Sequence, residues 1–203
     1  VGTLAVDVDI NFVSTTINFA PNAEIWVGTG TTLQILDNSL LYACSDMWEG
    51  IFAFGPNKHV VVSLSTIKHM KQGVYISGGA TLQSLDSKYH DNYVGIYLNV
   101  CNNNYGEIKS CEFKTIISPL KPPYNLQNRG EHGVVIYKGE NITIGDPLNS
   151  LNKNTFENLY NGIYIKDENY LSFQNTITTT YNTFKNIKGG PSLMGVNAPP
   201  WGT

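Results

Sequence analysis

Gly95-Ile96-Tyr97-Leu98-Asn99 is one of five short stretches in which a glycine precedes alternating apolar residues. The other four are Gly50-Ile51-Phe52-Ala53-Phe54, Gly73-Val74-Tyr75-Ile76-Ser77, Gly133-Val134-Val135-Ile136-Tyr137 and Gly162-Ile163-Tyr164-Ile165-Lys166. A second signal keeps a fixed distance from the first, because an apolar or aromatic residue stands six positions before a glycine at Ile67, Tyr89, Phe156 and Phe184. Two signals in constant phase indicate a solenoid, in which each repeat buries its apolar face against its neighbours.

The five glycines that begin these stretches are separated by 23, 22, 38 and 29 residues. The first two intervals suit one coil of a parallel β-helix, with roughly three short strands per coil. Leucine-rich repeats need a recurring Leu-x-x-Leu-x-Leu frame, which is absent, and helical repeats need about 33 residues or more. The alternation with period two, rich in Val, Ile, Thr and Tyr, favours strands. The sequence therefore predicts an all-β solenoid of about seven to nine coils.

Two insertions explain the longer intervals. The run from Ser118 to Tyr124 contains three prolines and cannot be a central strand, because proline donates no ladder hydrogen bond. We therefore expect an inserted loop at residues 117–131. The extra residues of the 29-residue interval are expected around Gly145-Asp146-Pro147, which is a turn signal. Near the N-terminus, residues 23–27 and 32–36 are expected to form two strands around a glycine-rich corner.

Length and composition bound the class of protein. The 203 residues predict one domain, with residues 1–20 as a first coil or N-terminal cap and residues 189–203 as a C-terminal cap or linker. The chain starts at Val1, which suggests a mature product or a segment of a longer chain. A net charge of −3 with 14% charged residues argues against a nucleic-acid partner. No apolar run is long enough for a membrane span.

Asparagine and cysteine usage adds two expectations. The 23 asparagines suit tight corners between strands and ladders between coils. Low charge together with abundant Asn, Thr and Gly suits a secreted or cell-surface protein. Cys44, Cys101 and Cys111 lack metal-ligand spacing and are expected to be small buried thiols, with a Cys101–Cys111 bridge as the alternative. Cys44 lies six residues before Gly50, which predicts a core position for it.

A family resemblance is carried by the Gly-Ile-Tyr-Ile strands, by the Asn-Thr-Phe-x-Asn motif at residues 154–158 and 182–186, and by the stretches at residues 19–27 and 46–51. With these motifs the chain resembles right-handed parallel β-helix repeat proteins, in particular the pectin-lyase-like regions of large secreted bacterial proteins. The resemblance covers residues 17–190. It implies a right-handed coil and three kinds of role: a polysaccharide-degrading enzyme, a carbohydrate-binding module, or a stalk or adhesin.

Catalytic motifs are missing from the sequence. Pectin hydrolases with this fold resemble one another in Asn-Thr-Asp, Asp-Asp and Gly-His-Gly motifs, and none of these is present. Arg129, Glu131 and His132, at the end of the expected loop, are the best candidates for a reactive group, because loops on rigid scaffolds often carry function. Nothing in the sequence predicts a metal or another cofactor. A polysaccharide lyase or glycoside hydrolase acting on an acidic polysaccharide is the alternative to a non-catalytic function.

The outward side chains favour a different role. If the residue after each glycine points inward, then Phe52, Tyr75, Tyr97 and Tyr164 point outward and align in a column interrupted by Val135. Exposed aromatic residues suit a sugar ring or a protein partner, whereas mutual stacking or cover by the loop would give them a structural role. Trp26 and Trp48 are expected to pack. The sequence thus predicts a non-catalytic module that binds a polysaccharide or a protein at a surface, or that acts as a rigid spacer.

Overall fold

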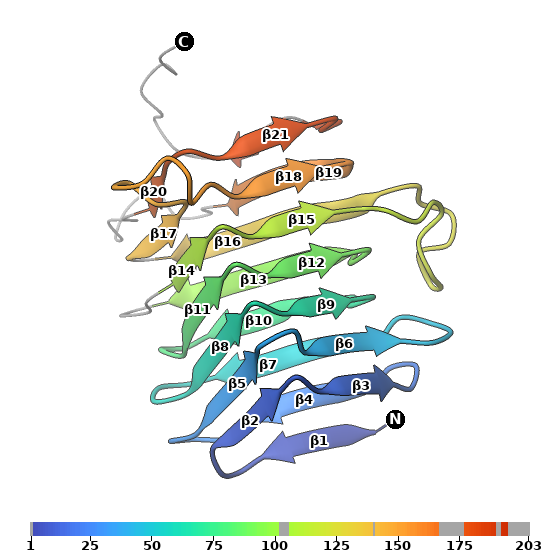
Figure 1. Cartoon of the computed structure of the whole chain (residues 1–203), viewed down its shortest axis with the longest axis vertical. Coiled ribbons are helices and arrows are strands. Elements are labelled where there is room, and N and C mark those ends of the chain that lie inside the picture. Colours follow the sequence, from blue (N-terminus) through green and yellow to red (C-terminus); the bar gives the residue numbers. More distant parts are fainter. Residues whose placement is uncertain (1, 102–105, 140, 167–176, 190–191, 195–203) are drawn as a thin grey trace.

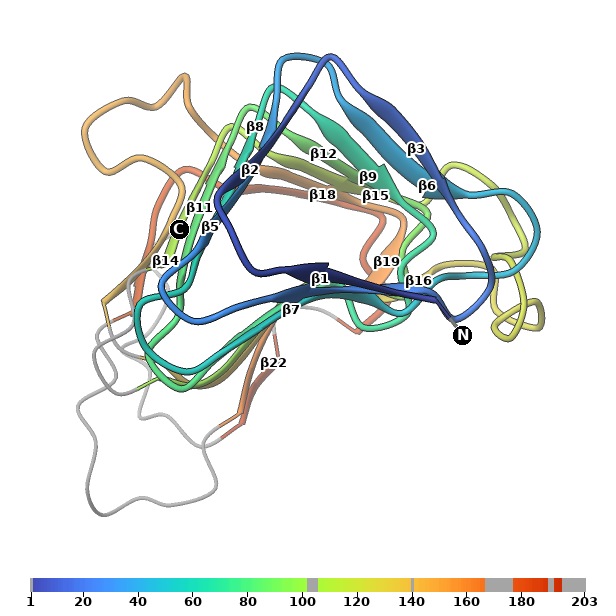
Figure 2. The same ribbon diagram turned by 90° about the horizontal axis from the view of Figure 1, so that it is seen from below.

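A computed structural model describes residues 2–101, 106–139, 141–166, 177–189 and 192–194, and Figure 1 shows their course. Within these residues there are 22 strands and no helix. The strands form three parallel sheets, and the chain passes through the sheets in turn. Figure 2 looks along the stack and shows a triangular cross-section. The prediction of an all-β parallel solenoid is confirmed, with seven complete coils.

The first sheet has eight strands: β1 (Thr3–Val6), β4 (Glu24–Val27), β7 (Gly50–Phe54), β10 (Val74–Ser77), β13 (Val94–Cys101), β16 (Gly130–Gly139), β19 (Leu159–Lys166) and β22 (Ser192–Met194). The second sheet has seven: β2 (Ile10–Val13), β5 (Thr32–Leu36), β8 (His59–Ser63), β11 (Thr81–Leu85), β14 (Gly106–Lys109), β17 (Ile142–Ile144) and β20 (Ile177–Thr179). The third sheet also has seven: β3 (Thr16–Phe19), β6 (Leu40–Ala43), β9 (Thr66–Lys68), β12 (Lys88–His90), β15 (Glu112–Lys114), β18 (Thr155–Glu157) and β21 (Thr183–Lys185).

The inward columns of the coil match the two sequence signals. Val74 pairs with Ile51 on one side and with Ile96 on the other, and the same column continues through Val134 to Ile163. In the third sheet the residues of the second signal form an internal aromatic stack, in which the ring centroids of Tyr89, Phe113, Phe156 and Phe184 lie 4.9, 4.9 and 5.1 Å apart in turn. Both signals therefore mark the core, except that Phe184, on the last strand of this sheet, is 42% exposed.

Cys44 departs from this pattern. It is exposed, and Leu41 takes the core position beside Ile67, nine residues before Gly50 rather than six. The reason is a longer corner between β6 and β7, which moves Cys44 out of register. Cys111 is a free buried thiol as expected, so the alternative bridge to Cys101 is not formed.

Asparagine ladders join neighbouring coils, as the composition suggested. The side-chain nitrogen of Asn154 donates to Oδ1 of Asn182 at 3.0 Å, and that of Asn186 donates to Oδ1 of Asn158 at 2.7 Å. Asn158 and Asn186 both have positive φ, at 55° and 52°, a conformation that asparagine tolerates better than most residues. These asparagines form corners and also connect one coil to the next.

Two long connections account for the irregular intervals. The first covers residues 115–129, between β15 and β16, so the insertion is confirmed but its expected end is wrong: residues 130 and 131 belong to β16. The second covers residues 145–154, between β17 and β18, where the turn signal predicted it. Most of the proposed C-terminal cap at 189–203 lies outside the described residues.

The 115–129 loop folds back along the stack at the corner between the third and first sheets (Figures 1 and 2). Nζ of Lys121 donates to the carbonyl oxygens of Ala43 and Cys44 at 2.7 and 2.5 Å, and the carbonyl of Pro122 accepts from the backbone nitrogen of Met47 at 2.8 Å. The loop thus reaches the corner of a coil three steps earlier, about 14 Å away at the spacing of paired strands.

Candidate functional site

The outer face of the first sheet carries a column of aromatic side chains, here called the aromatic ladder: Trp26, Phe52, Tyr75 and Tyr97 on β4, β7, β10 and β13. Pairing of the strands places them in one register. Their ring centroids lie 5.3, 6.0 and 4.7 Å apart in turn. The rings of Tyr75 and Tyr97 are within 6° of parallel. The strand register thus aligns residues that lie more than twenty positions apart in the sequence.

The rings of the ladder differ in how much of their surface reaches solvent. Phe52 is only 5% exposed, because Trp26 and Tyr75 lie on either side and Phe54 lies 5.9 Å away from it, centroid to centroid. Phe52 therefore offers almost no contact surface to a ligand. Tyr75 and Tyr97 are half-buried: they stack on each other, and Phe54 meets Tyr75 at 5.1 Å with 82° between planes, so part of each tyrosine stays accessible.

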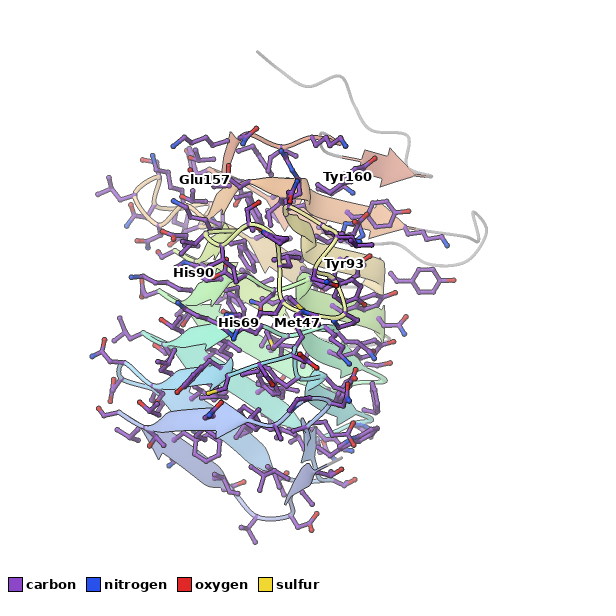
Figure 3. All side chains as sticks on the ribbon, turned by 90° about the vertical axis from the view of Figure 1, so that its right-hand side faces the viewer. Met47, His69, His90, Tyr93, Glu157 and Tyr160 are labelled. Atoms are coloured by element: carbon purple, nitrogen blue, oxygen red, sulfur yellow. The ribbon has the colours of Figure 1, made fainter. Side chains whose placement is uncertain are left out.

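Tyr164, the fourth predicted contact, lies further along the same column beyond Val135, which is 4% exposed. Its ring stacks on His132 with 4.9 Å between centroids. Tyr164 thus belongs to the same outer face but to a separate stack. Among the described residues of the loop, Tyr124 stacks on Tyr93 at 3.7 Å, at the corner seen in Figure 3, rather than on the ladder.

A second candidate site lies where the 115–129 loop meets β16 and β19. A pocket of about 440 Å³ is lined by Leu126, Gln127, Asn128, Arg129, Glu131, Tyr160 and Lys188. Nη1 of Arg129 donates to the carbonyl of Asn186 at 3.2 Å, and Nζ of Lys188 lies 5.6 Å from the centroid of the Tyr160 ring. Burial raises the pKa of the Glu131 carboxyl. The pocket therefore combines two cations, one carboxyl group and one aromatic ring.

His132 does not join this group. Its Nδ1 lies 3.2 Å from the side-chain nitrogen of Asn161, and burial lowers the pKa of its imidazole to about 4. The structure thus places Arg129 and Glu131 on one pocket and His132 in a stack with Tyr164. Sequence reasoning missed Tyr160 and Lys188. The register of β16 and β19 brings Tyr160 beside Glu131, while Lys188 reaches the pocket only because its coil returns to the same corner.

The described residues contain no group of three or more His, Cys, Asp or Glu side chains placed to hold a metal ion. The part of the chain that the structure describes has no helix long and apolar enough to cross a membrane. Trp48 is fully buried, stacks on Phe19 at 4.1 Å and donates from Nε1 to the carbonyl of Lys68, which confirms its packing role.

Comparison with known proteins agrees with the fold. The sequence model of the right-handed β-helix region matches residues 25–198, so the chain belongs to the right-handed β-helix family. No curated protein and no solved structure shows significant similarity to the chain. The family assignment therefore establishes the architecture and the hand of the coil, and it assigns no activity to any residue.

Proposed function

We propose that this chain is a non-catalytic module of a secreted or cell-surface protein and that it binds a glycan on the outer face of its first sheet. The observation that carries the proposal is the aromatic ladder, whose rings Trp26, Tyr75 and Tyr97 all keep part of their surface open to solvent. Aromatic rings combine a flat apolar surface with a polar group, which suits sugars. A solenoid repeats such a contact along its axis, as an extended polymer requires.

The polar surroundings of the ladder support the same role. Nδ2 of Asn99 donates to the hydroxyl of Tyr75, and Ser77 shares the register of Asn99. Neutral hydroxyl and amide groups next to tyrosine edges provide donors and acceptors for sugar hydroxyl groups. Few charges lie along this face: within the described residues of β4, β7 and β10, only Glu24 is ionisable apart from the tyrosine. The ladder is therefore suited to hydrogen bonding more than to ionic recognition.

A panel of immobilised polysaccharides, with binding measured by affinity electrophoresis and calorimetry, tests the proposal. Replacing Tyr75 and Tyr97 by alanine should weaken binding at least about tenfold, because contact aromatics commonly dominate such interfaces. Tyr42→Ala is the matched control, since Tyr42 is a half-buried tyrosine on β6 of the third sheet. Unchanged binding in the double variant would remove the two tyrosines as contacts. Wild-type protein that binds no polysaccharide would contradict the proposal and leave the role of a rigid spacer.

An enzyme acting on an acidic polysaccharide is the second candidate, favoured by the pocket that holds Arg129, Glu131, Tyr160 and Lys188. A cation there would neutralise a substrate carboxylate, and a carboxyl group of raised pKa would exchange a proton. Incubation with uronic-acid polymers distinguishes the two functions. A lyase releases unsaturated, ultraviolet-absorbing products and a hydrolase releases reducing ends, and Glu131→Gln should abolish either signal. A binding module leaves the polymers intact.

A further inference from the structure

Trp26 differs from the other rings of the ladder in the use of its two faces. One face stacks on Phe52 at 5.3 Å, and Phe54 meets the indole edge-on at 5.0 Å with 71° between planes. On the opposite side the register neighbour is Ala5 on β1, a small and exposed residue. Trp26 is 37% exposed. The ladder therefore ends in a partly exposed indole whose register neighbour contributes only a methyl group.

One carboxylate stands on β4 two positions from this indole, and a second lies close to Gly28 at the end of the same strand. Two positions before Trp26, Oε1 of Glu24 accepts a hydrogen bond of 2.8 Å from Oγ1 of Thr3. Gly28 stands two positions after Trp26, and Oδ1 of Asp7 lies 3.0 Å from the point where a Cβ on Gly28 would be. A Cβ on Gly28 would also lie 2.8 Å from the carbonyl oxygen of Val6, so the missing side chain allows a close approach of β1, which holds the Asp7 carboxylate beside Gly28. Carboxylate oxygens are strong acceptors for hydroxyl groups.

The N-terminal sequence around the indole is acidic, although one of its carboxylates, Glu49, is paired with Lys71 at 2.7 Å. Residues 1–57 contain six acidic residues and no lysine or arginine: Asp7, Asp9, Glu24, Asp37, Asp46 and Glu49. Two negative charges about 4 Å apart repel by about 1 kcal/mol even at the dielectric constant of water. A ligand carrying a carboxylate or sulfate group is therefore disfavoured at this end of the solenoid. A flat, uncharged and hydroxyl-rich ligand is favoured.

We propose that the outer face of β1 and β4 is a binding site for an uncharged sugar residue. The apolar face of the sugar lies on the indole of Trp26, and its hydroxyl groups donate to the carboxylates of Glu24 and Asp7. The inference deepens the glycan-binding function proposed above, on which it rests, because it names the residue that carries most of the contact and the class of sugar. It also predicts rejection of uronic acids, which the second candidate function would require as substrates.

The site is tested with oligosaccharides matched in linkage and length, one series neutral and one in which the C6 hydroxymethyl group is a carboxylate. Calorimetry with the wild-type chain should give at least about fivefold tighter binding of the neutral series, as one repulsive charge pair of about 1 kcal/mol implies. Trp26→Ala should lose at least about tenfold in affinity, and Trp26→Phe, which keeps the stack on Phe52, should retain part of it. Leu148→Ala, which alters a 95% exposed residue on the connection between β17 and β18, should change nothing.

The role of the Glu24 and Asp7 carboxylates is tested separately. Glu24→Gln and Asp7→Asn keep the size of each side chain and remove its charge, so the double variant should lose the discrimination between the two series. Unfolding by denaturant confirms that each variant retains the fold. Wild-type preference for the acidic series, or neutral binding unchanged in Trp26→Ala, would overturn the proposed site. If binding survives Trp26→Ala but is lost in the Tyr75 and Tyr97 double variant, only this inference fails and the general function stands. If binding is lost in Trp26→Ala but survives in the double variant, Trp26 is the site and the tyrosines are not contacts.

Discussion

Gly133 and the ring of Phe156 occupy adjoining space: a Cβ on Gly133 would lie 2.6 Å from Cδ1 of Phe156 and 2.6 Å from the carbonyl oxygen of Gly162. The same relationship holds one coil earlier between Gly95 and Phe113, at 2.8 Å. The missing side chain of each glycine thus makes room for an aromatic ring of the core. The contact joins each of these glycines to the aromatic residue of the third-sheet strand that follows it, so the two signals meet in the core.

Gly133→Ala should therefore destabilise the protein strongly. The new methyl group meets backbone as well as a ring that is already stacked on both sides, so the clash cannot be relieved by rotating one flexible side chain. A loss of about 3 kcal/mol or more in the free energy of unfolding is expected, at the upper end for overpacking. Urea denaturation followed by circular dichroism measures it. Gly2→Ala is the control, since nothing lies within 4 Å of that Cβ position; equal stability of the two variants would show that the glycine is not needed for the ring.

Asn154→Ala should remove one rung of the asparagine ladder. Asn154 is fully buried; its Oδ1 accepts from the backbone nitrogen of Cys111 at 2.8 Å, and its Nδ2 donates to the carbonyl of Ile108 at 2.9 Å. The variant leaves two buried backbone groups without partners, which costs about 2–4 kcal/mol. The same denaturation experiment applies, with the exposed Asn125→Ala as control. A cost below about 1 kcal/mol would mean that water satisfies both groups.

The periodic part of the fold was predictable because its cause is local in every coil. A glycine, an inward aliphatic residue and an aromatic residue six positions upstream recur wherever the corners have similar length, and register follows from them. The prediction for Cys44 was wrong because the corner from residue 44 to residue 49 is longer than the corresponding corner of the next coil. The composition of this corner does not reveal its length. The place to which the 115–129 loop returns was equally hidden, since Lys121 and Ala43 are 78 residues apart.

The candidate sites show the same limit. The outward phase of Phe52 and Tyr75 follows from alternation, but the covering of Phe52 depends on the nearby ring of Phe54 and on stacking between coils. Trp26 was expected to pack, because the small size of its neighbour Ala5 matters only once β1 and β4 are paired. The pocket at Arg129 and Glu131 needs Lys188, more than fifty residues later. Each missed feature lies in contacts between coils.

The free thiols Cys44 and Cys111 should react at very different rates. Cys44 is exposed, whereas Cys111 is 1% exposed and lies 3.2 Å from Oγ of Ser84. Burial raises the pKa of the Cys111 thiol to about 11, which further lowers the fraction of reactive thiolate at neutral pH. Iodoacetamide labelling with peptide mapping should modify Cys44 in the native protein and Cys111 only in denaturant. Native labelling of Cys111 at the rate of Cys44 would contradict the buried position.

Acid should destabilise the fold through His69, which lies beneath the 115–129 loop. Nδ1 of His69 donates to the carbonyl of Ala43 at 2.9 Å, while burial and the nearby Lys121 charge lower the pKa of the imidazole from 6.5 to about 4. The His69 imidazole therefore binds a proton at higher pH in the unfolded chain than in the native state. The free energy of unfolding accordingly falls as pH drops from about 6.5 to about 4. The contribution of His69 is at most about 3 kcal/mol.

His69→Asn should flatten this part of the pH profile, since asparagine tolerates the φ of 61° and carries no titratable group. Urea denaturation between pH 4 and pH 7 measures how the free energy of unfolding changes with pH. His59→Asn, at an exposed position on β8, is the matched control. Identical pH dependence in the His69 variant and the wild type would show that His69 is protonated as readily in the native state as in the unfolded chain.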